Sequence, residues 1–86
     1  MKFACLHVSQ APRYALGRDA RTDVPIFSIP VSNTLCDYEE YYRIDESELA
    51  RFLSEPETAA AFAQSCGRRE MDDRLVLKPG TDRGYY

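Results

Sequence analysis

The sequence predicts an α+β domain, in which two consecutive helices cover one face of a mainly antiparallel sheet of about four strands. The helix signals are confined to one block, residues 44–70, and short runs rich in β-branched and aromatic residues precede and follow it. Strands that are grouped together, without helices interleaved between them, are typical of α+β domains rather than of parallel α/β sheets. The 86 residues fit a single domain, residues 1–86.

The first strand is expected at Phe3–Val8, whose sequence FACLHV is apolar on both faces apart from His7. Such a strand is typical of the interior of a sheet. Ser9–Asp23, with a proline, a glycine and three arginines, is expected to be a loop, with room for a short extra strand around Tyr14–Leu16. Long loops often carry binding residues, so this loop is a candidate for function.

The next strand is expected at Val24–Val31, which contains Pro25 and Pro30. Proline cannot donate a hydrogen bond to a neighbouring strand, so the sequence places this strand at a sheet edge or at a bulge. A further strand is expected at Tyr38–Ile44, where one parity is apolar except for Glu40 and the other is mostly polar. That alternation predicts a half-buried strand that runs into the first helix.

Two helices are expected in residues 44–70. Asp45 suits the N-cap of the first, because its carboxylate accepts from backbone N–H groups of the opening turn, and Glu48 completes a capping box. Pro56 interrupts the apolar period, so we expect a break near Ser54, which would cap the second helix. Gly67 is placed as the C′ residue, where a positive φ costs glycine little.

The two helices are expected to face the sheet through apolar residues that recur at i, i+3 and i+4. The residues expected at this interface are Leu49, Phe52, Leu53, Phe62 and Cys66. After the helices, Arg74–Lys78 is expected to add a last strand, which Pro79 and Gly80 end.

The net charge of −3 is mild, but the charges are unevenly distributed. Residues 37–57 contain eight acidic residues and two arginines, a local net charge of −6, and the segments on either side are mildly positive. The chain therefore lacks the overall basic character that is typical of nucleic-acid-binding domains.

Three cysteines at wide spacing, Cys5, Cys36 and Cys66, match neither a disulfide framework nor a zinc motif. We expect three buried thiols in a reducing compartment. No apolar run is long enough to span a membrane, and the N-terminus lacks a signal-peptide pattern. We therefore expect a cytoplasmic protein without a membrane partner.

Few residues are candidates for catalysis. Cys5 and His7 share one face of the expected strand, which would suit a nucleophile with its base or two metal ligands; the simpler interpretation is a histidine packed beside the sheet. Glu40 lies among apolar residues, where a carboxylate needs a partner or marks a site, unless it reaches solvent or an arginine. No phosphate-binding loop or catalytic elbow is present. We expect no catalytic activity, no cofactor and no required metal.

Tyrosines alternate with acidic residues at the start of the acidic segment. Tyrosine supplies a large contact area together with a hydroxyl group, and it is enriched at protein interfaces. Even if Tyr38 and Tyr42 belong to the core, Tyr41 is expected to be exposed. The residues predicted to bind a protein partner are Glu39, Tyr41, Glu46 and Glu48, two from the strand and two from the start of the adjoining helix.

The second half of the chain, roughly residues 38–84, resembles a known class of proteins. The segments YEEYYRIDESELARFL, SEPETAAAFAQSCGRRE and DDRLVLKPGTDRG look like those of small bacterial immunity proteins of polymorphic toxins, particularly of contact-dependent growth inhibition systems. The resemblance implies a cytoplasmic protein that binds a toxin domain and blocks it. Many such toxins are nucleases with basic clefts, which an acidic, tyrosine-bearing face would complement. Immunity proteins share no catalytic residues, so the resemblance transfers a role and no site.

Two other classes of function stay open at this stage. A small nucleic-acid-binding or regulatory module would use the arginines, provided that the fold gathers them on one face: Arg13, Arg18, Arg21, Arg68, Arg69, Arg74 and Arg83. A small enzyme would use Cys36 or Glu40 beside a cleft. Neither the identity of the partner nor the oligomeric state follows from the sequence.

Overall fold

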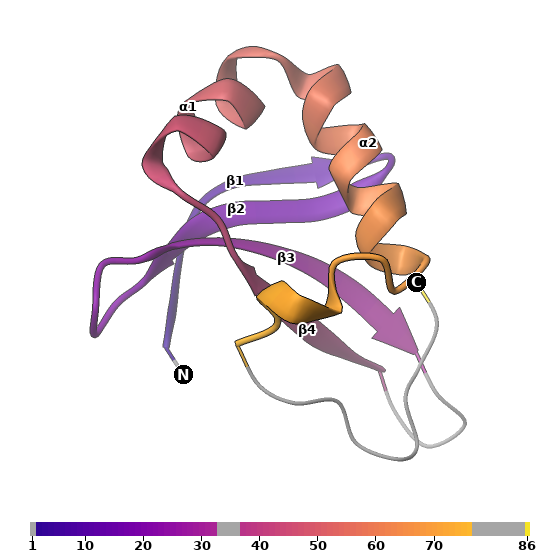
Figure 1. Ribbon diagram of the computed structural model, residues 1–86, viewed down its shortest axis with the longest axis horizontal. Helices are drawn as coiled ribbons and strands as arrows, with labels where there is room; N and C mark the ends of the chain where they lie inside the picture. The colour runs from indigo at the N-terminus through magenta and orange to yellow at the C-terminus, as the bar shows by residue number, and fades with distance from the viewer. Residues whose placement is uncertain (1, 33–36, 77–85) are drawn as a thin grey trace.

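The computed structural model describes residues 2–32, 37–76 and 86, and it contains one four-stranded antiparallel sheet and two α-helices (Figure 1). The strands are β1 (Phe3–Gln10), β2 (Arg13–Asp19), β3 (Pro25–Ser32) and β4 (Asp37–Arg43). The helices are α1 (Glu46–Ser54) and α2 (Pro56–Gly67), and a short 3₁₀ helix, η1 (Asp72–Arg74), follows. The predicted α+β class is confirmed.

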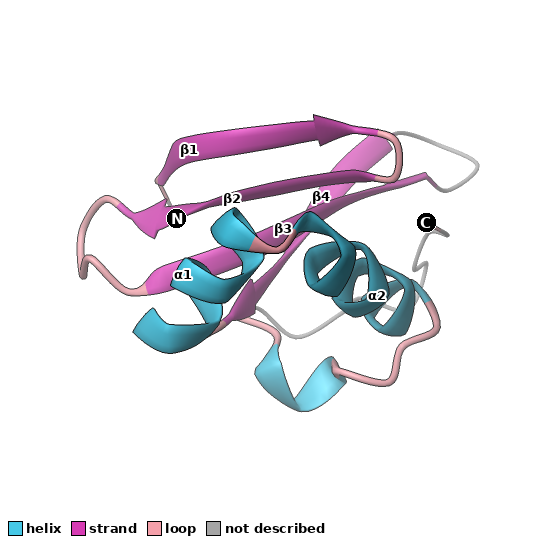
Figure 2. Ribbon diagram, turned by 90° about the horizontal axis from the view of Figure 1, so that it is seen from above, coloured by secondary structure: helices cyan, strands magenta, loops and turns pink. Residues whose placement is uncertain are grey.

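Each strand pairs with the next one along the chain, in the order β1-β2-β3-β4. Both helices lie on one face of this sheet, where they pack over β2 and β3, and β1 lies beyond them at one edge (Figure 2). Within the described part of the chain, no helix combines the length and the apolar character that crossing a membrane requires.

The second strand of the sheet was predicted only as a possible short strand around Tyr14–Leu16, and it is longer than that. Most of the expected loop, Ser9–Asp23, is strand: β2 pairs with β1 through residues 13–19 and with β3 through residues 15–18. The buried Tyr14 and Leu16 alternate with the small residues Ala15 and Gly17, which is the period of a strand. The arginines around this short pattern made it look like a loop.

A last strand was expected at Arg74–Lys78, and for the residues that the structure describes this expectation is wrong. Arg74 belongs to η1, and the Leu75 N–H donates to the Asp72 carbonyl, so the chain is still turning at that point. Leu75 forms a single antiparallel bridge with Tyr42, and the Val76 N–H donates to the Tyr41 carbonyl (2.9 Å). Residues 77 and 78 lie outside the described residues.

The positions of β1 and β3 in the sheet are the reverse of those predicted. β1 is an edge strand, although its sequence is apolar, and Leu6 and Val8 are 58% and 55% exposed. β3 is central, although it contains two prolines. The helices are centred on β3, so burial follows the place of a strand under the helices and not its mean hydropathy.

The backbone pairing explains how β3 accommodates its prolines. Pro25 is the first residue of the strand, and its carbonyl accepts from the Ile44 N–H (3.1 Å). In an antiparallel pair the bonds to one neighbour come from alternate residues, so the nitrogen of Pro30 faces β2 and not β4. The pairing of β2 with β3 ends at Ala15 and Ser28, and Pro30 therefore interrupts no bond between these two strands.

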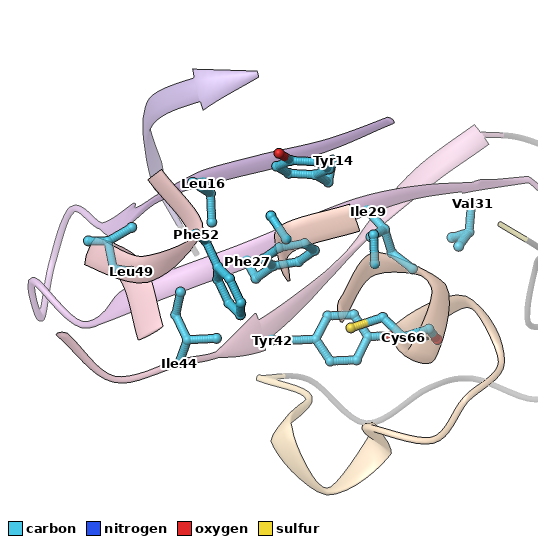
Figure 3. Packing of buried hydrophobic residues seen from close by; sticks show 12 residues of the cluster. Tyr14, Leu16, Phe27, Ile29, Val31, Tyr42, Ile44, Leu49, Phe52 and Cys66 are labelled. Carbon is cyan, nitrogen blue, oxygen red and sulfur yellow. Dashed lines mark hydrogen bonds between the residues drawn. The ribbon is translucent and has the colours of Figure 1, made fainter. Parts of the chain in front are cut away.

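The core lies between the sheet and the helices, and Phe27 of β3 is at its centre (Figure 3). The Phe27 ring stacks on Tyr14 at 5.2 Å between centroids and meets Phe62 and Phe52 edge-on at 4.8 and 5.4 Å. These are favourable aromatic geometries, worth about 0.5–1.5 kcal/mol per pair beyond the burial of area.

The predicted helix face is largely confirmed. Leu49, Phe52 and Cys66 are buried and Phe62 is packed against the core. The prediction that Leu53 faces the sheet is wrong, because this residue is 45% exposed. It follows Phe52 by about 100° around the helix, and Phe52 already occupies the position above Phe27.

The ends of the helices confirm one predicted cap and correct two. The Asp45–Glu48 capping box is present, with bonds of 2.7 and 2.9 Å in the two directions. The N-cap of α2 is Glu55, without a side-chain bond, since Ser54 is still the last residue of α1 and its hydroxyl donates to the Arg51 carbonyl. Gly67 remains helical.

The left-handed position after α2 is taken by Arg69, with φ 64°, and not by Gly67. Gly67 instead allows a close approach, because a Cβ atom there would lie 2.6 Å from the ring of Tyr86. The glycine is therefore explained by tertiary packing rather than by the end of the helix.

Candidate partner-binding face

The two faces of the sheet carry different side chains. The covered face contains the large residues of the core, and the opposite face, which we call the open face, contains the residues between them in sequence. On the two middle strands most of these are small, and Ile26 is the large one: Ala15, Gly17, Ile26, Ser28 and Pro30. Neither helix covers the open face (Figure 2).

Two aromatic side chains from the two edge strands meet over part of the open face. The rings of Phe3 on β1 and Tyr41 on β4 lie 5.5 Å apart between centroids, although two strands separate them. Gly17 makes this possible, because a Cβ atom there would lie 2.9 Å from the Phe3 ring and 2.2 Å from the Ala4 carbonyl oxygen. Two residues of this face on β3, Ile26 and Ser28, are buried although neither helix covers them.

The rest of the open face forms a groove of about 300 Å³ beside the aromatic pair. Cys5 and Val8 line it from β1, Ala15 from β2 and Pro30 from β3. The groove also has two charged residues, Glu39 on β4 and Arg13 on β2. Sequence reasoning identified Glu39 and Tyr41 but missed the β1 and β2 residues, because β2 was interpreted as a loop.

Glu39 and Tyr41, two of the four predicted partner-binding residues, lie together on this face. Among the residues that the structure describes, the Glu39 carboxylate makes no hydrogen bond or ion pair, and it is exposed. Tyr41 is partly buried, and this burial, followed by the negative charge of Glu39, raises the pKa of its hydroxyl above the usual value. Tyr41 therefore offers a neutral hydroxyl and a ring edge.

The other two predicted residues, Glu46 and Glu48, lie in the first turn of α1, on the helix side of the sheet, and both are paired. Arg18 makes two bonds of 2.7 Å to the Glu46 carboxylate, which hold the pKa of Glu46 below its usual range. Glu48 accepts from Arg74 at 2.8 Å and also completes the capping box. The structure thus separates the four residues into two pairs.

The local charge of −6 is therefore not a single acidic surface. Arg18 and Arg74, from outside the acidic segment, neutralise Glu46 and Glu48, and Arg51 lies 4.0 Å from Glu55. Asp45 is occupied in capping α1, and hydrogen bonds from the Glu48 backbone and the Ser47 hydroxyl lower its pKa. Exposed acids without such a partner in the described part of the chain include Glu39 and Asp37, both on β4.

The candidates for catalysis are not brought together. The pairing of β1 with β2 shifts between Cys5 and His7, so that Cys5 is opposite Gly17 and His7 is opposite Leu16. Gly17 and Leu16 belong to opposite faces, and the expectation that Cys5 and His7 share a face is wrong. Cys36 lies outside the described residues.

The buried carboxylate Glu40 is part of the core. It is 7% exposed, and the Tyr42 hydroxyl donates to it at 2.8 Å. The interpretation that Glu40 reaches solvent is therefore wrong, and the tyrosine serves as its partner. Glu40 does not line the groove on the open face.

The thiols differ in environment. Cys66 is buried as expected, and burial raises the pKa of its thiol to about 12. Cys5 is exposed, so the expectation of three buried thiols is wrong for this residue. Cys5 lies opposite Gly17, on the face of the sheet that neither helix covers.

The arginines do not form one basic face in the part of the chain that the structure describes. Arg18, Arg68 and Arg74 each pair with a glutamate, and Arg74 also lies over the Phe62 ring at 5.5 Å. This arrangement does not support a nucleic-acid-binding module.

Comparisons of the chain with models of protein families, with curated proteins and with solved structures found no match.

Proposed function

We propose that this chain is a cytoplasmic immunity protein, which binds a cognate bacterial toxin domain, in particular a nuclease, and neutralises it by masking the active site. The observation that carries this proposal is the open face: a sheet surface with an aromatic pair beside a groove that Glu39 lines, a carboxylate without a partner among the described residues. Aromatic residues that are surrounded by polar groups are the usual anchors of protein interfaces.

The exposed acids of β4 fit a basic partner, although Arg13 lines the same groove. Glu39 and Asp37 are exposed on β4, and the described residues contain no cation that pairs with either of them. Opposite charges on two partners speed their encounter, and a nuclease cleft that binds phosphates is basic. In this proposal Tyr41 and Glu39 anchor the partner, and Glu46 and Glu48 stabilise the start of α1.

The test is inhibition and binding of the toxin domain encoded next to this chain's gene, with the wild type and three variants. Glu39→Lys should slow association and alter its salt dependence, because an attractive charge becomes repulsive. Tyr41→Ala should weaken binding by about 2 kcal/mol or more, as expected for an anchor. Glu57→Lys, in the first turn of α2, is the matched control and should bind like the wild type.

Glu48→Lys is not a clean probe of binding, because it also removes the cap of α1 and the pair with Arg74. If Glu39→Lys and Tyr41→Ala bind like the wild type while an arginine variant such as Arg13→Glu does not, the partner surface is acidic. The proposal that a basic cleft is masked would then be wrong.

A further inference from the structure

The groove on the open face combines apolar walls with one carboxylate. Val8, Ala15 and Pro30 present short apolar side chains, the Phe3 ring closes one end, and Glu39 is the acidic residue among the described residues that line it. Its volume of about 300 Å³ is at the lower limit of pockets that hold small molecules, so it suits one long side chain better than a large ligand.

We propose that this groove receives a lysine or arginine side chain of the protein partner, an inference that rests on the proposed function. Both side chains have an apolar stem and a charged head, and they cover apolar surface with the stem while the head remains near polar groups. The groove has apolar walls at Val8 and Ala15 for the stem and the carboxylate of Glu39 for the charged head.

The second charged residue of the groove sets the direction of the bound cation. Arg13 is on β2 and Glu39 is on β4, with Pro30 of β3 between them. Two strand spacings separate their backbones by about 10 Å. A cationic head is therefore attracted to the β4 side and repelled from the β2 side, and an anionic head would be placed the opposite way.

A probe that needs no partner protein tests the charge preference directly. n-Butylammonium, n-butanol and butyrate share an apolar stem and differ in the charge of the head. Each is titrated against the ¹⁵N-labelled chain at constant ionic strength, and amide shifts are followed by NMR. We expect n-butylammonium to shift the amides of Val8, Ala15 and Glu39 and to bind at least threefold more tightly than n-butanol.

Variants separate the contribution of the carboxylate from that of the walls. Glu39→Gln should abolish the preference for n-butylammonium over n-butanol, and Glu57→Gln, the matched control on α2, should keep it. Ala15→Leu fills the groove and should reduce the binding of both probes. If Ala15→Leu does not fold, Glu39→Gln still decides, because it changes an exposed side chain without a partner among the described residues.

Three outcomes would overturn the inference: n-butanol binding as tightly as n-butylammonium, butyrate binding more tightly than either, or Glu39→Gln keeping the preference for the cation. When toxin binding is measured without any of these small molecules, Glu39→Gln should lower the affinity for the toxin domain at least fivefold. If n-butylammonium binds the groove as expected but the chain neither binds nor inhibits the toxin domain, the proposed function alone is wrong. A toxin complex that leaves the groove amides unshifted would refute this inference alone.

Discussion

The two faces of the sheet are built from neighbouring residues of the same strands, yet they differ in almost every property. On β2 the covered face has Tyr14 and Leu16, and the open face has Ala15 and Gly17. On β4 the covered face has Tyr42, which is fully buried, and the open face has the partly exposed Tyr41. Successive side chains of a strand point to opposite faces. Residues that stabilise the core therefore alternate in sequence with residues that a partner can contact.

The polar groups show the same division. On the helix side, Glu40, Glu46 and Glu48 all have partners, and two of these partners are arginines from distant parts of the chain. On the open face, Glu39 has no such partner among the described residues. A carboxylate without a partner among the described residues is available for binding. Substitutions on the helix side and on the open face test this division.

The largest effect is expected at the centre of the covered face. Phe27→Ala should destabilise the domain by about 3–5 kcal/mol, because it removes a buried aromatic ring with three aromatic contacts and leaves a cavity. Phe62→Ala should cost less, since this ring is only partly buried. Urea unfolding measures both. A cost below about 0.5 kcal/mol for Phe27, as for surface changes, would show that the core is elsewhere.

The next effect is expected at a glycine of the open face. Gly17→Ala should cost about 1–3 kcal/mol, because the new methyl group overlaps a backbone oxygen, that of Ala4, which cannot move without β1. Gly67→Ala is the comparison. The atoms nearest its methyl group belong to the Tyr86 side chain and not to the backbone, and alanine favours the helix by up to about 1 kcal/mol, so the cost should be smaller. Equal destabilisation by the two substitutions in thermal or urea unfolding would contradict this account of Gly17.

The adjacent tyrosines of β4 provide the third pair. Tyr42→Phe removes the hydroxyl that donates to the buried Glu40, and we expect a loss of about 1–3 kcal/mol, the usual cost of depriving a buried polar group of a partner. Tyr41→Phe should change stability by less than about 0.5 kcal/mol. The same unfolding experiments measure both variants, and a larger loss for Tyr41→Phe would reverse the assignment of the two faces.

The smallest effect is expected in the acid dependence of stability. Because Arg18 lowers the pKa of Glu46 in the folded state, this pair stabilises the fold fully above the unfolded value of about 4.3. The stabilisation is lost as the pH falls from there through the lower folded value. Glu46→Gln should therefore reduce the slope of unfolding free energy against pH below about pH 4. Equal slopes for Glu46→Gln and the wild type would remove the role given to Arg18.

Local signals in the sequence predicted some elements well. The Asp45–Glu48 capping box and the apolar face of α1 and α2 depend on residues three or four positions apart, and both are present. The alternation in β4 also placed Tyr42 inside and Glu39 outside. The predictions about β1, β3 and Gly67 failed for a different reason. Each depended on what lies next to the residue in space, and that neighbour comes from another part of the chain.

Local patterns in the sequence were enough to predict the α+β class, the first cap and the parity of β4, because periodicity and capping act within a few residues. Which strand lies at the edge depends on the fold, since the helices cover β2 and β3 and leave β1 exposed. The pairing of the acids depends on the fold too. Arg18 meets Glu46 across 28 positions and Arg74 meets Glu48 across 26, so these charges cancel only after folding, and Glu39 on the open face has no such partner among the described residues.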